Sequence, residues 1–253
     1  MSRAKIHWLV GDRLPEHAAM LEAVPGVGNV GKLVVDSLVE KHPSRTLAWI
    51  LHPDFPPHAT LDGNSLLAPP RIRIDSVLLP DGRTVIAVGG NLQPMTAAGQ
   101  HEVSEAILQL ASESNTPQLL VLAGLAAGAE DRQIHVICAD ANVRKNLEEG
   151  DIPVSREHPE AGMIGIAGLL ISLSPMYSVS TIGLVAETMG ASADVVAADR
   201  LSNWIEAAFE LPLDLSLDST EKIAARILGE MNAGGDLEET LSMTEGETGD
   251  FYV

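Results

Sequence analysis

Residues 21–31 read Leu-Glu-Ala-Val-Pro-Gly-Val-Gly-Asn-Val-Gly, and this stretch decides the fold that we expect. A short apolar segment leads into a turn with three glycines, and residues 32–41 then carry apolar side chains at helical spacing. A strand, a glycine turn and a helix in this order are typical of an α/β unit, in which the helix packs back onto a sheet. His42 and Pro43 end the helical pattern, because the residue before a proline disfavours helical dihedrals.

Apolar runs and helical patterns alternate along the rest of the chain. We expect a strand at 46–51 that is buried on both faces, and a hairpin of strands 72–79 and 84–88 around Gly82. We expect further strands at 6–10, 118–123 (ended by Gly124), 134–139 and 180–187, and helices at 97–112, 164–173, 192–209 and 219–231. This alternation predicts an α/β fold with a parallel or mixed sheet that is covered on both sides.

The composition indicates one aliphatic core in a reducing compartment. Apolar residues make up 45% of the 253 residues and aromatic residues only 3%. Cys138 is the single cysteine, which excludes an internal disulfide and fits the cytoplasm. We expect no signal peptide, and the longest apolar stretch (163–176) is interrupted by polar residues and is too short to cross a bilayer.

The charge balance excludes one class of partner. With 35 acids against 16 bases the net charge is −19, whereas a nucleic-acid-binding surface must be basic to neutralise phosphates. Anionic membranes are disfavoured for the same reason. We therefore expect neither nucleic acid nor membrane as a partner.

The composition changes after Met231. Residues 232–253 hold six acids, four glycines and no base. Such a segment buries too little apolar surface to offset the entropy of ordering it. We expect one α/β domain over 1–231, followed by a flexible acidic tail over 232–253.

The tail ends in Phe251, Tyr252 and Val253, although the whole chain has only eight aromatic residues. In a pocket of another protein both rings can be buried, and the carboxylate of Val253 can pair with a lysine. Capture of a C-terminal carboxylate is a known recognition mode. The alternatives are that the tail folds back onto its own domain or that the residues are accidental.

The glycine stretch permits a second interpretation. Gly26, Gly28 and Gly31 match the dinucleotide-binding spacing, and Asp54 follows an expected strand, where it could meet a ribose hydroxyl. Glu187, at the end of another expected strand, would lie at the edge where α/β proteins hold ligands. The alternatives are a tight turn that packs the helix on the sheet, and a helix cap or turn at Glu187.

The sequence contains no convincing catalytic set. Nucleophile-elbow and zinc-protease motifs are missing, and no pair of histidines has zinc-ligand spacing. We interpret Cys138 as a small buried apolar residue, and His101 at the start of a helix as a weak candidate for a general base. We therefore expect a protein that is not an enzyme and that needs no metal and no cofactor.

Several stretches together resemble the proteasome assembly chaperone family, in the archaeal and bacterial homologues of its second-type subunit. The resemblance is carried by residues 25–32, 88–94, 162–170, 184–190 and 194–198, and it covers about residues 20–230. The terminal Phe-Tyr-Val is similar to the hydrophobic-tyrosine-any (HbYX) tail of proteasome activators.

The resemblance implies a three-layer α/β/α sandwich that is similar to nucleoside phosphorylases, in a homo-oligomer or paired with a family member. It also implies that the tail enters pockets between α-subunits of the proteasome core particle. Phe251 would be the apolar anchor, Tyr252 the specificity residue and Val253 the carboxylate donor, and the glycine turn would be structural.

These observations leave three functions open. The first is a proteasome-binding chaperone or activator. The second is a small-molecule enzyme on a phosphorylase-like fold, with its cleft near Gly26, Gly28, Gly31 and Glu187. The third is a general scaffold for assembling proteins.

Overall fold

The computed structural model describes residues 3–61, 65–128, 130–157, 162–190, 192–216 and 222–228. Its main sheet has eight strands in the order β1-β3-β6-β7-β2-β8-β10-β9. The strands are β1 (Lys5–Trp8), β2 (Met20–Ala23), β3 (Ser44–Leu51), β6 (Ile72–Leu78), β7 (Thr84–Gly90), β8 (Leu119–Ala126), β9 (Ile134–Ile137) and β10 (Thr181–Thr188). A separate short hairpin joins β4 (Thr60–Leu61) to β5 (Leu67–Ala68). The helices are η1 (Val27–Asn29), α1 (Val30–Lys41), α2 (Ala97–Glu113), α3 (Ala141–Glu149), α4 (Gly165–Tyr177) and α5 (Val195–Phe209).

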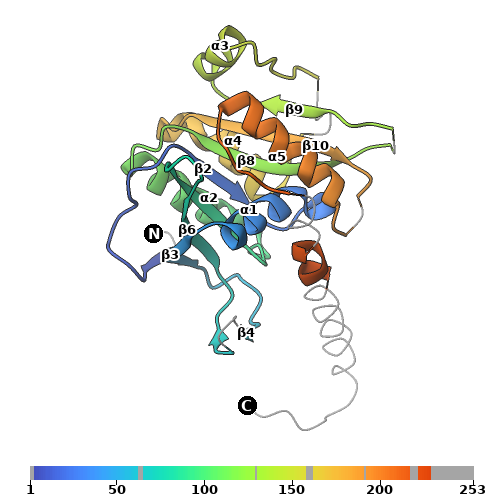
Figure 1. Ribbon diagram of the computed structural model, residues 1–253. Coiled ribbons are helices and arrows are strands. Elements are labelled where there is room, and N and C mark those ends of the chain that lie inside the picture. The colour runs from blue at the N-terminus through green and yellow to red at the C-terminus, as the bar shows by residue number, and fades with distance from the viewer. Residues whose placement is uncertain are drawn as a thin grey trace.

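Helices cover both faces of the sheet. In Figure 1, α1 and α5 lie on the near face, and α2 and α4 lie behind the sheet. Strands β7, β2, β8 and β10 are parallel, and the flanking strands pair antiparallel. The expected α/β sandwich with a mixed sheet is therefore confirmed, whereas the likeness to nucleoside phosphorylases stays a prediction.

The central strand β2 carries an unusual residue. Glu22 is 0% exposed, and neither of its carboxylate oxygens has a hydrogen-bond partner among the described residues. It shares its strand face with Met20 and Val24, which belong to the apolar core beneath α2 and α4. Burial raises the pKa of Glu22 to about 8, so this carboxyl is held protonated at neutral pH.

Two sequence expectations about strands are wrong in detail. β3 is not buried on both faces: Ala48 and Ile50 are buried, but Trp49 and Leu51 are partly exposed, because β3 lies next to the edge strand β1. Gly124 does not end its strand, since β8 continues to Ala126. The hairpin of β6 and β7 forms as expected, with Gly82 at a φ of +87°.

A short helix at residues 222–228 packs on α1. Ile223 and Ile227 are 2% exposed and belong to the core on the α1 face. Arg226 binds Glu40 at 2.8 Å and Asp36 at 3.5 Å. The last described helix is thus attached to the domain, and the expected tail at 232–253 lies outside the described residues. In the described part of the chain, no helix has the length and apolar character of a membrane span.

Candidate functional site

The glycine turn lies at the edge of the sheet where the parallel strands end. β2 leads into η1 and α1, and Gly28 has a φ of +64° that favours glycine. A Cβ on Gly31 would lie 2.3 Å from the main-chain oxygen of Leu122, and a Cβ on Gly124 would lie 2.1 Å from that of Val27. The glycines thus let the turn and the first residues of α1 touch the main chain of β8.

Polar groups around this turn bind one another. The Thr188 hydroxyl donates to Asp194 Oδ2 at 2.6 Å, and the main-chain N–H of Asp194 donates to the Gly28 oxygen at 2.8 Å. Asp194 also caps α5, because its Oδ1 accepts from the N–H of Ala197. Asn29 donates to the main-chain oxygen of Ser192. These bonds join the turn to β10 and α5, which supports the structural interpretation of the glycines.

Glu187 lies at the same edge as Gly26, Gly28 and Gly31, as the sequence predicted, but its carboxylate points toward β9. It accepts from the N–H of Gln133 at 2.7 Å and lies 3.0 Å from His135 Nε2. The expected ligand cleft at this edge stays a prediction, because Glu187 and the glycines face different neighbours.

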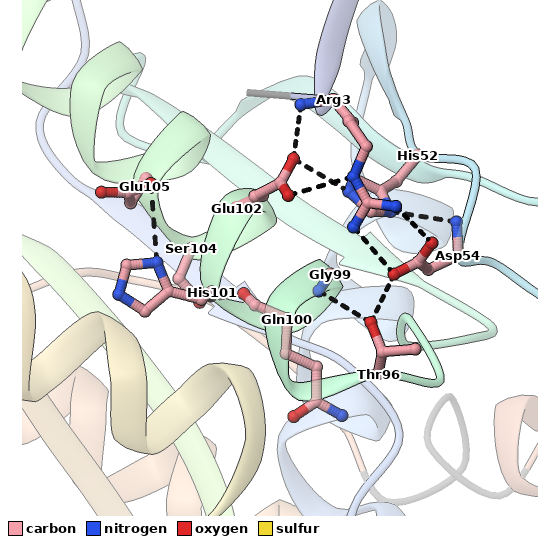
Figure 2. Close-up of polar contacts among 10 residues, drawn as sticks. All are labelled: Arg3, His52, Asp54, Thr96, Gly99, Gln100, His101, Glu102, Ser104 and Glu105. Atoms are coloured by element: carbon pink, nitrogen blue, oxygen red, sulfur yellow. Dashed lines mark hydrogen bonds and ion pairs between the residues drawn. The ribbon is translucent and has the colours of Figure 1, made fainter. Parts of the chain in front are cut away.

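A second polar cluster joins the N-terminal segment to the start of α2 (Figure 2). The guanidinium of Arg3 binds both carboxylate oxygens of Asp54, at 2.9 and 3.0 Å, and its Nε binds Glu102 at 3.1 Å. Asp54 also accepts from Thr96, the residue that caps α2. The hydroxyl of Thr96 and the guanidinium of Arg3 hold the pKa of Asp54 below its usual range.

His52 also belongs to this cluster. The N–H of Asp54 donates to His52 Nδ1 at 3.1 Å, so the ring proton sits on Nε2, which donates to Glu102 at 3.3 Å. The main-chain N–H and the side chain of Arg3, together with His52, lower the pKa of Glu102 to about 2. Glu102 and Asp54 therefore stay ionised at any physiological pH, and the cluster is suited to fastening two segments and not to accepting protons.

A groove of about 640 Å³ lies beside this cluster. Its walls are three basic residues and four apolar ones: Arg3, Lys5, His52, Leu51, Pro53, Pro69 and Pro70. None of the described residues that line it carries a carboxylate, although the chain has a net charge of −19. In the described part of the chain Lys5 is exposed and forms no ion pair. The groove therefore combines an apolar wall with a free cation.

The other residues that the sequence offered for ligand binding or catalysis have surroundings that do not suit those roles. Asp54, considered for a ribose, is bound by Arg3 and Thr96. His101 is exposed and lies 3.5 Å from Glu105. Burial raises the pKa of the Cys138 thiol, which makes it a poor nucleophile. Among the described residues, no group of three or more His, Cys, Asp or Glu side chains is placed to hold a metal.

Sequence reasoning missed the Arg3 cluster and the groove. Arg3 and Glu102 are separated by 99 residues, and no local pattern pairs them. The one sequence feature that indicated part of this cluster was the predicted start of a helix at residue 97, directly after Thr96, which is a good capping residue. The terminal residues Phe251, Tyr252 and Val253 lie outside the described residues.

The fold and the sequence together define the protein family to which this chain belongs. A model of the PAC2 family matches residues 20–233, most of the chain, and the chain belongs to the PAC2 family. The predicted membership of the proteasome assembly chaperone family is confirmed. An uncharacterized protein of Methanocaldococcus jannaschii is 26% identical over 177 residues, which are 69% of this chain and 67% of that protein.

Solved structures with the same fold include two proteins of Pyrococcus furiosus. PbaB, an archaeal proteasome activator, superposes with a TM-score of 0.73 at 20% identity, over 93% of this chain and 100% of PbaB. PbaA, an archaeal homolog of proteasome-assembly chaperone, gives 0.72 at 18% identity, over 94% of this chain and 100% of PbaA. A proteasome-assembly chaperone homologue of Mycobacterium tuberculosis gives 0.62 at 16% identity, over 85% of this chain and 93% of that chain.

Proposed function

We propose that this chain is a proteasome-binding assembly chaperone or activator that docks Phe251-Tyr252-Val253 into pockets of the core-particle α-ring. The observation that carries the proposal is the PAC2 family match over residues 20–233, together with the activator and chaperone-homologue neighbours. The terminal residues have the chemistry of a short docking segment: two rings for burial and a carboxylate for a lysine.

The anchorage of helix 222–228 supports this use of the tail. Ile223 and Ile227 in the core, with Arg226 bound to Glu40, hold the base of the tail against α1. We infer that the 22 residues from 229 to 250 serve as a linker for the terminal three. A flexible chain of the 25 residues from 229 to 253 would have a root-mean-square reach of about 25–30 Å, enough to carry the terminal residues clear of the domain.

Several tails acting together would strengthen binding. Three residues bury little area, so a single tail binds weakly, whereas tails on one oligomer gain by effective concentration. Large apolar side chains are exposed on the described surface, Ile164 by 94%, Met176 by 71% and Met189 by 67%, and such side chains suit contacts between subunits. We therefore propose a homo-oligomer or a pair with another family member. A monomeric mass in light scattering, with binding intact, would refute this part of the proposal.

Removal of residues 251–253 is expected to abolish binding to purified core particle from the same source. Tyr252→Ala alone should weaken binding by more than about 1 kcal/mol, the usual mark of an interface hot spot, because the tail has few other anchors. Met243→Ala, an apolar truncation within the same tail, is the matched control and should leave affinity unchanged. The measurement is a calorimetric titration of full-length protein and variants against core particle.

Equal affinity of the Tyr252→Ala and Met243→Ala variants would contradict tail docking. Binding that survives the deletion would instead favour the domain itself as the contact surface, as in a general scaffold. Hydrolysis of small peptides by the core particle then tests gate opening, and reconstitution of the particle from its subunits tests assembly.

A further inference from the structure

We propose that the groove of Arg3, Lys5 and Pro53 holds the terminal Phe251-Tyr252-Val253 of its own chain when no proteasome is present. This inference rests on the proposed docking role of the tail and adds a regulation to it. The occupant is this chain's own tail, and a second copy or another protein is an alternative that the experiment below distinguishes.

The groove has the chemistry that the terminal residues need. Leu51, Pro53, Pro69 and Pro70 form an apolar wall, and the proline rings are rigid, so little side-chain entropy is lost when an aromatic ring packs on them. Lys5 stands at the groove without an ion pair among the described residues, ready for a carboxylate.

Electrostatics favours a carboxylate at Lys5. Among the described residues that line the groove, Arg3 is balanced by Asp54 and Glu102, whereas Lys5 forms no ion pair. Arg3 is already bound to Asp54 and Glu102, so Lys5 is the cation that remains for the carboxylate of Val253.

Two residues of the groove, Lys5 and Leu51, point to the face of the sheet on which the base of the tail packs. Lys5 pairs with Leu51 across β1 and β3, so both side chains point to one face. Ile50 points into the core beneath α2, so Leu51 and Lys5 point to the opposite face, which α1 covers farther along the sheet. Helix 222–228 packs on that same α1 face.

A chain of contacts also connects helix 222–228, the base of the tail, with the groove. Arg226 of helix 222–228 lies 3.5 Å from Asp36, which lies 3.3 Å from Arg73. Arg73 follows Pro70 by three residues, or about 10 Å of extended chain. These contacts connect the base of the tail to the strand that begins beside the groove, and a flexible chain of 25 residues has a root-mean-square reach of about 25–30 Å. A tail docked at the groove would therefore gain by effective concentration.

Fluorine NMR of the full-length chain labelled with 3-fluorotyrosine tests this inference, because the chain has only two tyrosines. Tyr177 bonds to Glu105 at 2.9 Å within the domain and serves as an internal reference. Tyr252, assigned with Tyr252→Phe, should differ from the same residue in a free peptide of residues 244–253. Lys5→Glu should lower the docked-to-free ratio at least about fivefold and move the Tyr252 signal toward the peptide position, because it replaces an attraction by a repulsion.

Lys145→Glu on α3 is the matched control, since Lys145 is 71% exposed and should leave the signal unchanged. A wild-type signal equal to that of the free peptide, or equal effects of the two variants, overturns the inference. Recovery of the docked signal when labelled Lys5→Glu protein is mixed with unlabelled protein that lacks residues 251–253 also overturns it, in favour of a second copy. The experiment contains no proteasome, so its failure leaves the proposed function standing. If the inference holds, Lys5→Glu also binds core particle more tightly, because more tails are free.

Discussion

Replacement of Glu22 by glutamine is expected to raise the free energy of unfolding at pH 7 by roughly 3 kcal/mol, because one pKa unit corresponds to about 1.4 kcal/mol. The reason is the position of Glu22 in the middle of β2, where it is fully buried without a hydrogen-bond partner among the described residues. In the unfolded chain the carboxyl ionises freely, and in the fold it must stay protonated.

The pH dependence of the free energy of unfolding follows from the pKa values of Glu22 in the unfolded and the folded state. Burial raises the pKa of Glu22 from 4.5 to about 8 in the folded protein. At pH values below 4.5, the pKa of this carboxyl in the unfolded chain, Glu22 is protonated in both the folded and the unfolded state, and its contribution to stability is fully present. As the pH rises to about 8, the unfolded state loses its proton and the folded state does not, so stability falls; above about 8 the loss is complete and constant.

Urea unfolding from about pH 4 to pH 9 measures this effect. The glutamine variant should lack the decline that the wild-type protein shows over this range. Glu16→Gln, at an exposed position, is the matched control and should retain the wild-type slope. Parallel curves for wild type and Glu22→Gln would show that the carboxyl finds a partner or water in solution.

Replacement of Gly31 by alanine is expected to lower the free energy of unfolding by roughly 3 kcal/mol or more, as overpacking against rigid main chain does. The added Cβ would lie 2.3 Å from the oxygen of Leu122 and 2.7 Å from its carbonyl carbon. These are main-chain atoms of a central strand, so relief requires α1 to move away from the sheet.

Gly26→Ala is the matched control within the same motif. Its φ of −161° is ordinary extended backbone, and the nearest atom to an added Cβ is the Val24 oxygen at 3.9 Å. Thermal and urea unfolding should show a large loss for Gly31→Ala and a change within about 0.5 kcal/mol for Gly26→Ala. A stable Gly31→Ala protein would remove the structural explanation of the motif and reopen the ligand-cleft interpretation.

The sequence predicted the elements whose residues interact locally. The helical spacing of residues 97–112 corresponds to α2, and the turn at Gly82 corresponds to the hairpin of β6 and β7. The end of β8 was misjudged at Gly124, because a glycine without a side chain weakens a strand locally, whereas here the approach of Val27 requires it. The burial of β3 was overestimated, because apolar composition does not reveal whether a strand lies near an edge.

The amino-acid sequence by itself determined the alternation of strands and helices, the family and the distinct composition of residues 232–253, since these depend on periodicity, turn chemistry and residue type. Only the tertiary structure decided the strand order, the fastening of Arg3 to Asp54 and Glu102, and the groove beside Lys5. Those features join residues that lie some 50 to 100 positions apart, such as Arg3 and Glu102 at a separation of 99. Contacts of that range form only when the sheet has brought its strands together, so no local pattern in the chain encodes them.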